Sequence, residues 1–143
     1  MKLTSLDFKN KEKIPAKFTG DGEDINPSLI IENIPENAKS LVLIVDDPDA
    51  IGGWDHWIVW NISVIGRILK IKENNIPGLQ GKTSWGGNEY RGPKPPSGTH
   101  RYFFRIIALD AVLNLREGSS REELEEAMKE HVLDKAELMG LYR

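Results

Sequence analysis

Four side chains capable of acid–base chemistry stand where turn-rich segments meet apolar runs. His56 opens an apolar run directly after DDPDAIGGW, and His100 opens another directly after GPKPPSG. Asp47 and Asp49 close a third run. Imidazole and carboxylate groups can exchange protons or hold a metal ion, and imidazole can donate hydrogen bonds to an anion. If these three segment ends share one rim, two imidazoles and one or two carboxylates converge there.

A structural interpretation of the same residues stays open. A histidine at the end of a strand is often a surface group or a hydrogen-bonded structural group, and the sequence alone does not separate that role from binding for His56 or His100. The third histidine, His131, falls on the apolar stripe of an expected helix, so we interpret it as a packing residue. Trp54 is compatible with the core as well as with a pocket wall.

Composition excludes several classes of function. The 143 residues include no cysteine, which rules out disulfides, thiol catalysis and thiolate metal sites. A net charge of −3 argues against a nucleic-acid partner. No glycine pattern of a phosphate loop or a nucleophile elbow is present. The N-terminal segment has no long apolar stretch, so we expect no membrane span and a cytoplasmic location.

Strand signals dominate the first three quarters of the chain. Apolar, β-branched and aromatic residues predict strands over Ser40–Asp46, His56–Ile62 and Arg101–Leu109, with weaker candidates at Ser28–Ile34 and Lys13–Gly20. The first of these is apolar throughout, as in a strand covered on both faces. Because turn-rich loops separate the strands, the pattern favours a sandwich or a closed sheet over an alternating βαβ fold.

The C-terminal quarter changes character. Ser120 and Glu123 form a capping-box pattern that predicts a helix over Arg121–His131. Its apolar stripe comprises Leu124, Ala127, Met128, His131 and Val132. A second short helix, DKAELMG, is expected to stop at Gly140. No repeat or long linker divides residues 1–143, which we expect to form a single domain.

Taken together, the motifs resemble the phosphatidylethanolamine-binding protein family, in particular its bacterial and archaeal branch, also called Raf kinase inhibitor-like. The resemblance is carried by FTGDGEDINPSL, SLVLIVDDPDA, WDHWIVWNI, YRGPKPPSGTHRYFFRIIALD and the tail ELEEAMKEHVLDKAELMGLY. It covers nearly the whole chain. The resemblance implies a mainly β fold, an antiparallel β-sandwich with one or two peripheral C-terminal helices and a small anion pocket at one end.

The resemblance also implies a set of ligand-binding residues and no catalytic residue, metal or cofactor. These residues are Asp47, Trp54, His56, Gly92, Pro93, His100 and Tyr102, with Asp49 and Arg101 as supports. Alternation along a strand puts His100 and Tyr102 on one face and Arg101 on the other. The prolines and glycines before His100 would set the loop before any ligand arrives, and Asp47 could orient a histidine.

The implied function is non-enzymatic. The family binds phosphate-like anions, including phospholipid head groups, and many members inhibit kinases or serine proteases. Two alternatives remain: a metal-assisted hydrolase using Asp47, His56 and His100, and a purely structural interaction domain. A monomer and a homodimer are both compatible with the sequence. Two positions depart from the family pattern, Lys94 in the proline loop and Ile51 after the Asp-Pro-Asp-Ala motif; we expect Lys94 to face water.

Overall fold

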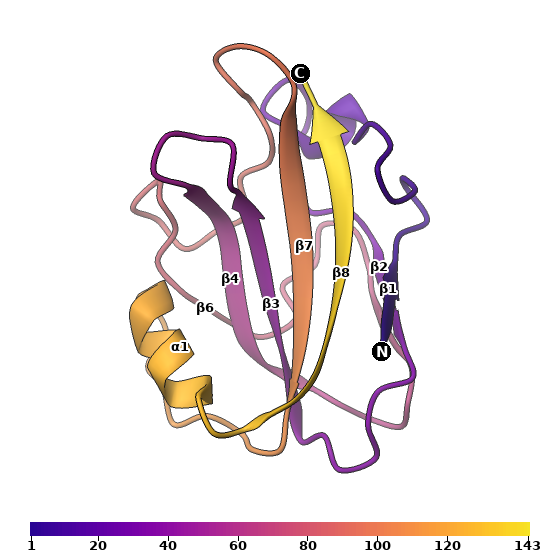
Figure 1. The fold of residues 1–143 in the computed structure, drawn as a ribbon, viewed down its shortest axis with the longest axis vertical. Helices are drawn as coiled ribbons and strands as arrows, with labels where there is room; N and C mark the ends of the chain where they lie inside the picture. The colour runs from indigo at the N-terminus through magenta and orange to yellow at the C-terminus, as the bar shows by residue number, and fades with distance from the viewer.

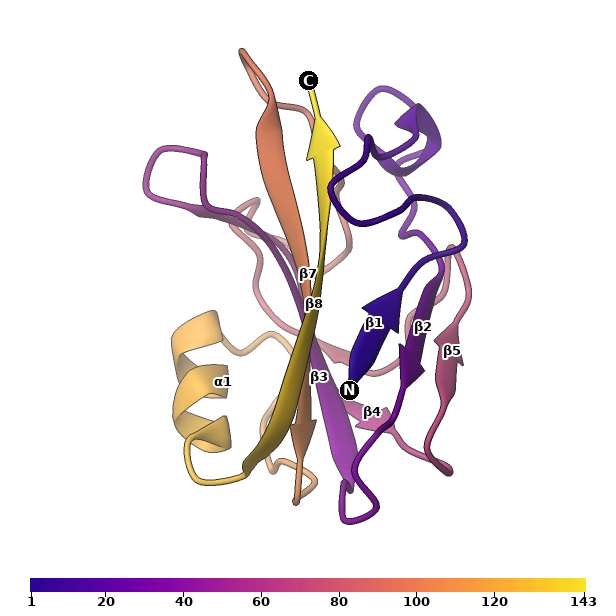
Figure 2. The same cartoon turned by 45° about the vertical axis from the view of Figure 1, so that its right-hand side comes forward.

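The computed structural model describes all 143 residues as two antiparallel β-sheets and one α-helix (Figure 1). The five-stranded sheet has the order β6 (Leu79–Gln80), β4 (Trp54–Ser63), β3 (Ser40–Asp47), β7 (His100–Leu109) and β8 (Val132–Tyr142). The three-stranded sheet has the order β1 (Lys2–Thr4), β2 (Leu29–Glu32) and β5 (Leu69–Ile71). The helix α1 (Arg121–Met128) lies on the side of the large sheet away from the small one (Figure 2). The expected antiparallel sandwich is confirmed.

The central strand β3 shows why the sequence folds in layers. All eight of its residues are buried. Leu41, Leu43 and Val45 belong to the core between the two sheets, whereas Val42 and Ile44 belong to a smaller core beneath α1. Alternating side chains of one apolar run therefore serve two cores, as expected for a strand covered on both faces.

The helix begins as predicted and ends earlier. The Ser120 hydroxyl accepts from the Glu123 N–H (3.1 Å), and the Glu123 carboxylate accepts from the Ser120 N–H (3.0 Å). Leu124 and Met128 are buried against the sheet and Ala127 packs beside them. The prediction is wrong for the last two residues of the stripe: the His131 side chain is 43% exposed and contacts Asp110, and Val132 is exposed at the start of β8.

The predicted second helix is wrong, because its residues form β8. This strand pairs with β7 along nearly its whole length. If these residues formed a surface helix, the backbone groups along that edge of β7 would have no strand to pair with. Gly140 does not stop a helix. A Cβ at this position would lie 2.4 Å from the Ile14 side chain, so glycine lets the N-terminal segment pack closely over β8.

The N-terminal quarter also departs from expectation. Lys13–Gly20 is not a strand: Lys13 makes one isolated bridge to Leu141, and a 3₁₀ turn follows at Ala16–Phe18. Ser28–Ile34 contains a strand, β2, that is shorter than predicted. The strands β1, β5 and β6 were not predicted, since two or three residues carry too little alternation to be recognised. None of the helices has the length and apolar character that a membrane span requires.

Candidate functional site

The end of β3 and the starts of β4 and β7 meet where these three strands end, at one end of the large sheet. Antiparallel pairing produces this arrangement, because β3 lies between β4 and β7 and runs opposite to both. A cavity of about 500 Å³ opens there. Six of the nine residues expected at the site line it: Asp47, Asp49, Trp54, His56, His100 and Tyr102. The other lining residues are Ala50, Ile51, Trp85, Lys94, Pro95, Pro96 and Ser97.

Asp47 holds the ring of His100. Its Oδ2 lies 2.6 Å from His100 Nδ1, and its Oδ1 accepts from the backbone N–H groups of Asp49 (2.8 Å) and Ala50 (3.2 Å). The turn after β3 therefore fixes the carboxylate, and the carboxylate fixes the imidazole. A neutral His100 that donates from Nδ1 to Asp47 has its Nε2 left for a ligand.

His56 is held by a different acceptor. Its Nδ1 lies 2.6 Å from the Arg91 carbonyl oxygen, an atom that can only accept, so Nδ1 carries the proton. Burial lowers the pKa of His56 below its usual 6.5. At neutral pH the ring is therefore uncharged and its Nε2 has a lone pair. This nitrogen becomes a hydrogen-bond donor only when the ring takes up a second proton.

Tyr102 packs against both imidazoles. Its ring centroid is 5.3 Å from that of His56, edge to face, and 6.4 Å from that of His100, nearly parallel. Burial, with the nearby charge of Asp47, raises the pKa of Tyr102, so its hydroxyl keeps its proton at any physiological pH. The predicted sharing of a face by His100 and Tyr102 is matched by their common place in the cavity wall.

Asp49 and Arg101 join the turn after β3 to the start of β7. Both carboxylate oxygens of Asp49 accept from the Arg101 guanidinium (2.8 and 3.0 Å), and the Arg101 backbone N–H adds a third bond (2.9 Å). These bonds lower the pKa of Asp49 to about 2. This ion pair stabilises the turn that follows Asp47. It also neutralises the charge of Arg101.

Gly92 and Pro93 lie behind the cavity wall and do not line it. The Gly92 N–H donates to Asp24 Oδ1 (2.6 Å), and the Pro93 carbonyl accepts from the Gly20 N–H (2.9 Å). A Cβ on Gly92 would lie 2.0 Å from the carbonyl oxygen of Phe18. Close backbone approach thus accounts for this glycine, but the approach is to the N-terminal segment.

Two residues at the mouth have contacts that the sequence did not indicate, although Lys94 is exposed to water as expected. The Lys94 ammonium pairs with Asp21 at 2.7 Å, although the Lys94 side chain is still 60% exposed. Trp85 stands edge-on to Trp54, with ring centroids 5.5 Å apart. The Arg91 guanidinium lies over the Trp85 ring at 4.9 Å. Trp85 sits in a turn-rich loop with no pattern around it, so its sequence carried no signal of this role.

The charges around the cavity are balanced in pairs. Three cationic side chains lie near it, and each has a carboxylate partner: Lys94 pairs with Asp21, Arg101 with Asp49, and Arg91 with Glu89. Asp47 adds a buried carboxylate. Protonation of the imidazoles would add positive charge that has no such partner at His56. The Trp54 indole N–H is also buried and has no hydrogen-bond partner in the chain.

The donor set required by a metal-assisted hydrolase does not form. No three histidine, aspartate or glutamate side chains are grouped so that they could hold a metal ion together. Asp47 and His100 are instead bonded to one another. The hydrolase alternative is not supported.

Comparison with known proteins agrees with the fold and with the motifs. Residues 4–143 match the family model described as phosphatidylethanolamine-binding protein. A UPF0098 protein of Pyrococcus abyssi is 49% identical over 99% of this chain and 84% of its own length. Another, from Methanothermobacter thermautotrophicus, is 47% identical over 100% of this chain and 99% of its own.

Solved structures give the same result. A phosphatidylethanolamine-binding protein homolog from Chlamydia trachomatis superposes with a TM-score of 0.92 at 43% identity, covering 99% of this chain and 96% of that one. Escherichia coli YbcL, a member of the mammalian phosphatidylethanolamine-binding protein family, gives 0.88 at 25% identity, covering 99% and 97%. The sandwich fold, the sequence motifs and the family model over residues 4–143 agree with one another. This chain therefore belongs to the phosphatidylethanolamine-binding protein family.

Proposed function

We propose that the chain binds a small phosphate-like anion, either free or as the head group of a phospholipid, in the cavity at the ends of β3, β4 and β7. One observation carries the proposal. The rings of His56 and His100 both lie beside Tyr102 in one cavity, and each is tied through Nδ1 to a protein acceptor. Two Nε2 atoms are thereby left for a ligand, already oriented.

Binding in this cavity is coupled to protonation. The only N–H of neutral His56 is used by Arg91, so an oxyanion at Nε2 requires the imidazolium form. The same holds for His100, whose Nδ1 faces Asp47. Once charged, each ring donates from both nitrogens, one bond to the protein and one to the anion. We therefore expect proton uptake on binding, and tighter binding at lower pH.

Sulfate calorimetry tests this proposal, because the charge of sulfate is constant over the relevant pH range. We expect weak binding at about pH 6 that fades towards about pH 8. His100→Ala should lose about 1–3 kcal/mol, the range for removing a partner from a charged hydrogen bond. His131→Ala is the matched control, since His131 also pairs with an aspartate, Asp110, but lies outside the cavity. Equal sulfate affinity in folded His100→Ala and wild type would contradict the proposal.

Modulation of a kinase or a serine protease is a second step of the proposal, and it rests on family membership. Inhibition assays with representative enzymes of both classes test it, each with wild type and His100→Ala. Inhibition that is lost together with sulfate binding supports a role for the cavity. Inhibition that survives in His100→Ala assigns that role to another surface, and an absence of inhibition removes this step while leaving anion binding to stand.

A further inference from the structure

Two aspartates face one another on the outer side of the large sheet, directly behind the cavity. Asp46 of β3 and Asp55 of β4 are cross-strand partners. Like charges placed directly opposite on neighbouring strands destabilise their pairing. Each aspartate is followed along the chain by a cavity residue, Asp47 in one strand and His56 in the other. The strand ends that build the cavity thus contain a repulsive pair.

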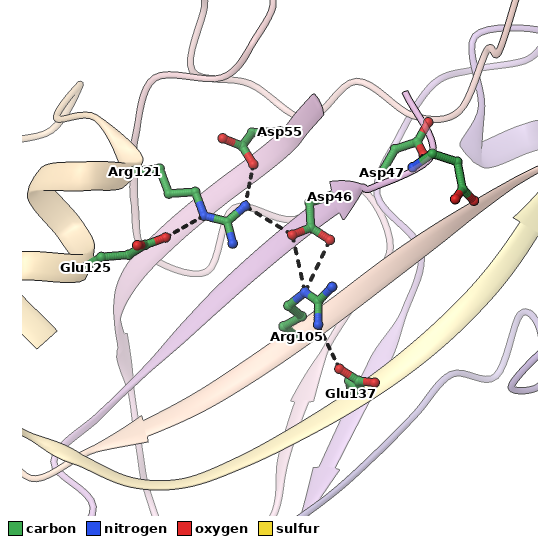
Figure 3. A network of polar contacts seen from close by, with 8 residues as sticks. Asp46, Asp47, Asp55, Arg105, Arg121, Glu125 and Glu137 are labelled. Carbon is green, nitrogen blue, oxygen red and sulfur yellow. Dashed lines mark hydrogen bonds and ion pairs between the residues drawn. The ribbon is translucent and has the colours of Figure 1, made fainter. Parts of the chain in front are cut away.

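One side chain from the helix bridges this pair. The Arg121 Nη1 donates to Asp46 Oδ2 (3.0 Å) and to Asp55 Oδ1 (2.6 Å), while its Nε donates to Glu125 (2.8 Å) (Figure 3). Arg105 of β7 also reaches Asp46, at 3.2 Å, but it turns its other nitrogen to Glu137 and makes no contact with Asp55. Among these cations, only Arg121 joins β3 to β4.

The bridge spans an irregularity in the pairing. Val45 pairs with Trp57, and the next residue, Asp46, pairs with Asp55. His56 is therefore an extra residue in β4, as in a β-bulge. Bulges bend a strand and re-aim a side chain, and they need support because the ladder is interrupted. Here the bulged residue is the histidine that lines the cavity.

We propose that Arg121 is a positioning residue for the cavity: from the opposite face of the sheet it holds Asp46 against Asp55, and so keeps the bulge that directs His56, and the strand end that carries Asp47, in place. Only the consequence for ligand affinity rests on the proposed anion binding. The consequence for the His56 ring does not, because the bond from its Nδ1 to Arg91 exists without a ligand.

The experiment follows the two ring nitrogens of His56 by ¹⁵N NMR, in the full chain without ligand, and sulfate affinity by calorimetry. In wild type at neutral pH, His56 should show one tautomer with the proton on Nδ1. Arg121→Gln should mix the tautomers, because the strand ends separate and the bond to Arg91 weakens. Sulfate affinity at about pH 6 should fall by roughly threefold to thirtyfold, the range for residues that act at a distance.

A charge-removing second substitution separates this role from general helix packing. Arg121→Gln/Asp55→Asn removes the repulsion as well as the bridge, and Asp46 keeps Arg105; the single tautomer and most of the affinity should return. Arg105→Gln is the matched control, since it also contacts Asp46 but does not cross to β4. It should leave the His56 tautomer unchanged.

Several results would overturn the inference. These are unchanged His56 ring signals in folded Arg121→Gln, no recovery in the double variant, or an equal effect of Arg105→Gln. If Arg121→Gln does not fold, Arg121→Lys carries the test, because a single ammonium cannot reproduce the fork that serves all three carboxylates; unchanged ring signals there also count against it. If wild type binds no sulfate, the proposed function fails, and the ring signals still decide the role of Arg121.

Discussion

Two hollows lie on opposite faces of the same strand ends, and they differ in what they leave free. The groove beside α1 is the larger, about 800 Å³ against about 500 Å³ for the cavity. Its two arginines, Arg105 and Arg121, are paired with carboxylates (Figure 3), whereas Lys129 and Lys135 line it without an ion-pair partner. The smaller cavity has two imidazoles that each keep one nitrogen uncommitted. We propose the smaller cavity as the binding site because the protein orients its free nitrogens, and not because of its size.

The comparison also shows how two adjacent residues take different roles. Asp46 and Asp47 follow one another in β3, so alternation sends them to opposite faces. Asp46 joins the ion pairs beside the helix, and Asp47 holds His100. In the groove, ion pairs and apolar packing hold the helix against the sheet. The cavity is built on the strand ends that these contacts stabilise.

The largest effect on the free energy of unfolding is expected from the buried apolar side chains between α1 and the sheet. Leu124 of α1 is fully buried, so Leu124→Ala should lower the free energy of unfolding by about 2–5 kcal/mol. Glu137→Gln, which removes only a half-exposed partner of Arg105, should cost at most about 1 kcal/mol. Urea unfolding measures both. A larger loss for Glu137→Gln would mean that the ion pairs, and not the buried side chains, hold the helix.

The next effect concerns the wall behind the cavity. Gly92→Ala would push a methyl group against the Phe18 carbonyl, so we expect a loss of about 1–3 kcal/mol in the free energy of unfolding. Gly87→Ala is the control, because nothing lies within 4 Å of a Cβ there. Equal stability of the two variants would show that the proline loop is not anchored at Gly92.

A smaller effect is expected from His56, in the pH dependence of the free energy of unfolding. The folded chain keeps His56 neutral, since burial lowers its pKa, whereas the unfolded chain protonates it near 6.5. As pH falls through that value, only the unfolded state gains this proton, so stability falls. Between about pH 7.5 and 5.5, wild type should lose roughly 1 kcal/mol more than His56→Gln. Urea unfolding at both pH values measures the difference, and saturating sulfate should reduce it. Parallel curves for the two proteins would contradict a depressed pKa.

The smallest effect concerns the brace at the cavity rim. Asp49 has a pKa of about 2 in the folded chain, below its usual 3.8, so its contribution to stability is complete above about pH 4 and is lost as pH falls towards 2. The pair with Arg101 is half-exposed, so Asp49→Asn should change stability by less than about 1 kcal/mol. Thermal unfolding from about pH 5 to pH 2 should show a shallower acid slope in the variant. An unchanged slope would mean that the brace adds nothing.

Much of the cavity could be predicted from the sequence because its parts lie at strand ends. Placing His56 and His100 at strand ends allowed a shared rim with the end of Ser40–Asp46, but the residues alone did not show that the three ends meet. The resemblance to the family supplied that expectation, together with the set of ligand-binding residues. Trp85 could not be found this way, because a loop residue reaches the cavity through tertiary packing and its neighbours in sequence show no periodicity.

The remaining errors have specific physical causes. The pattern of the tail DKAELMG is compatible with a helix or a strand. It forms the strand β8 because the edge of β7 is available for pairing. The His56 bulge and the Asp46–Asp55 pair depend on register, which no local pattern reveals. Gly92 was expected to bind the ligand, whereas the Phe18 carbonyl lies against it, and no local sequence pattern reveals that neighbour.

A crystal soaked in sulfate at about pH 6 tests the central claim most directly, because both hollows are present in one molecule. The account predicts an anion in the smaller cavity, within hydrogen-bond distance of Nε2 of His56 and Nε2 of His100, and none in the groove between Arg105 and Arg121. An anion held by those arginines, with the two imidazoles unoccupied, would contradict it.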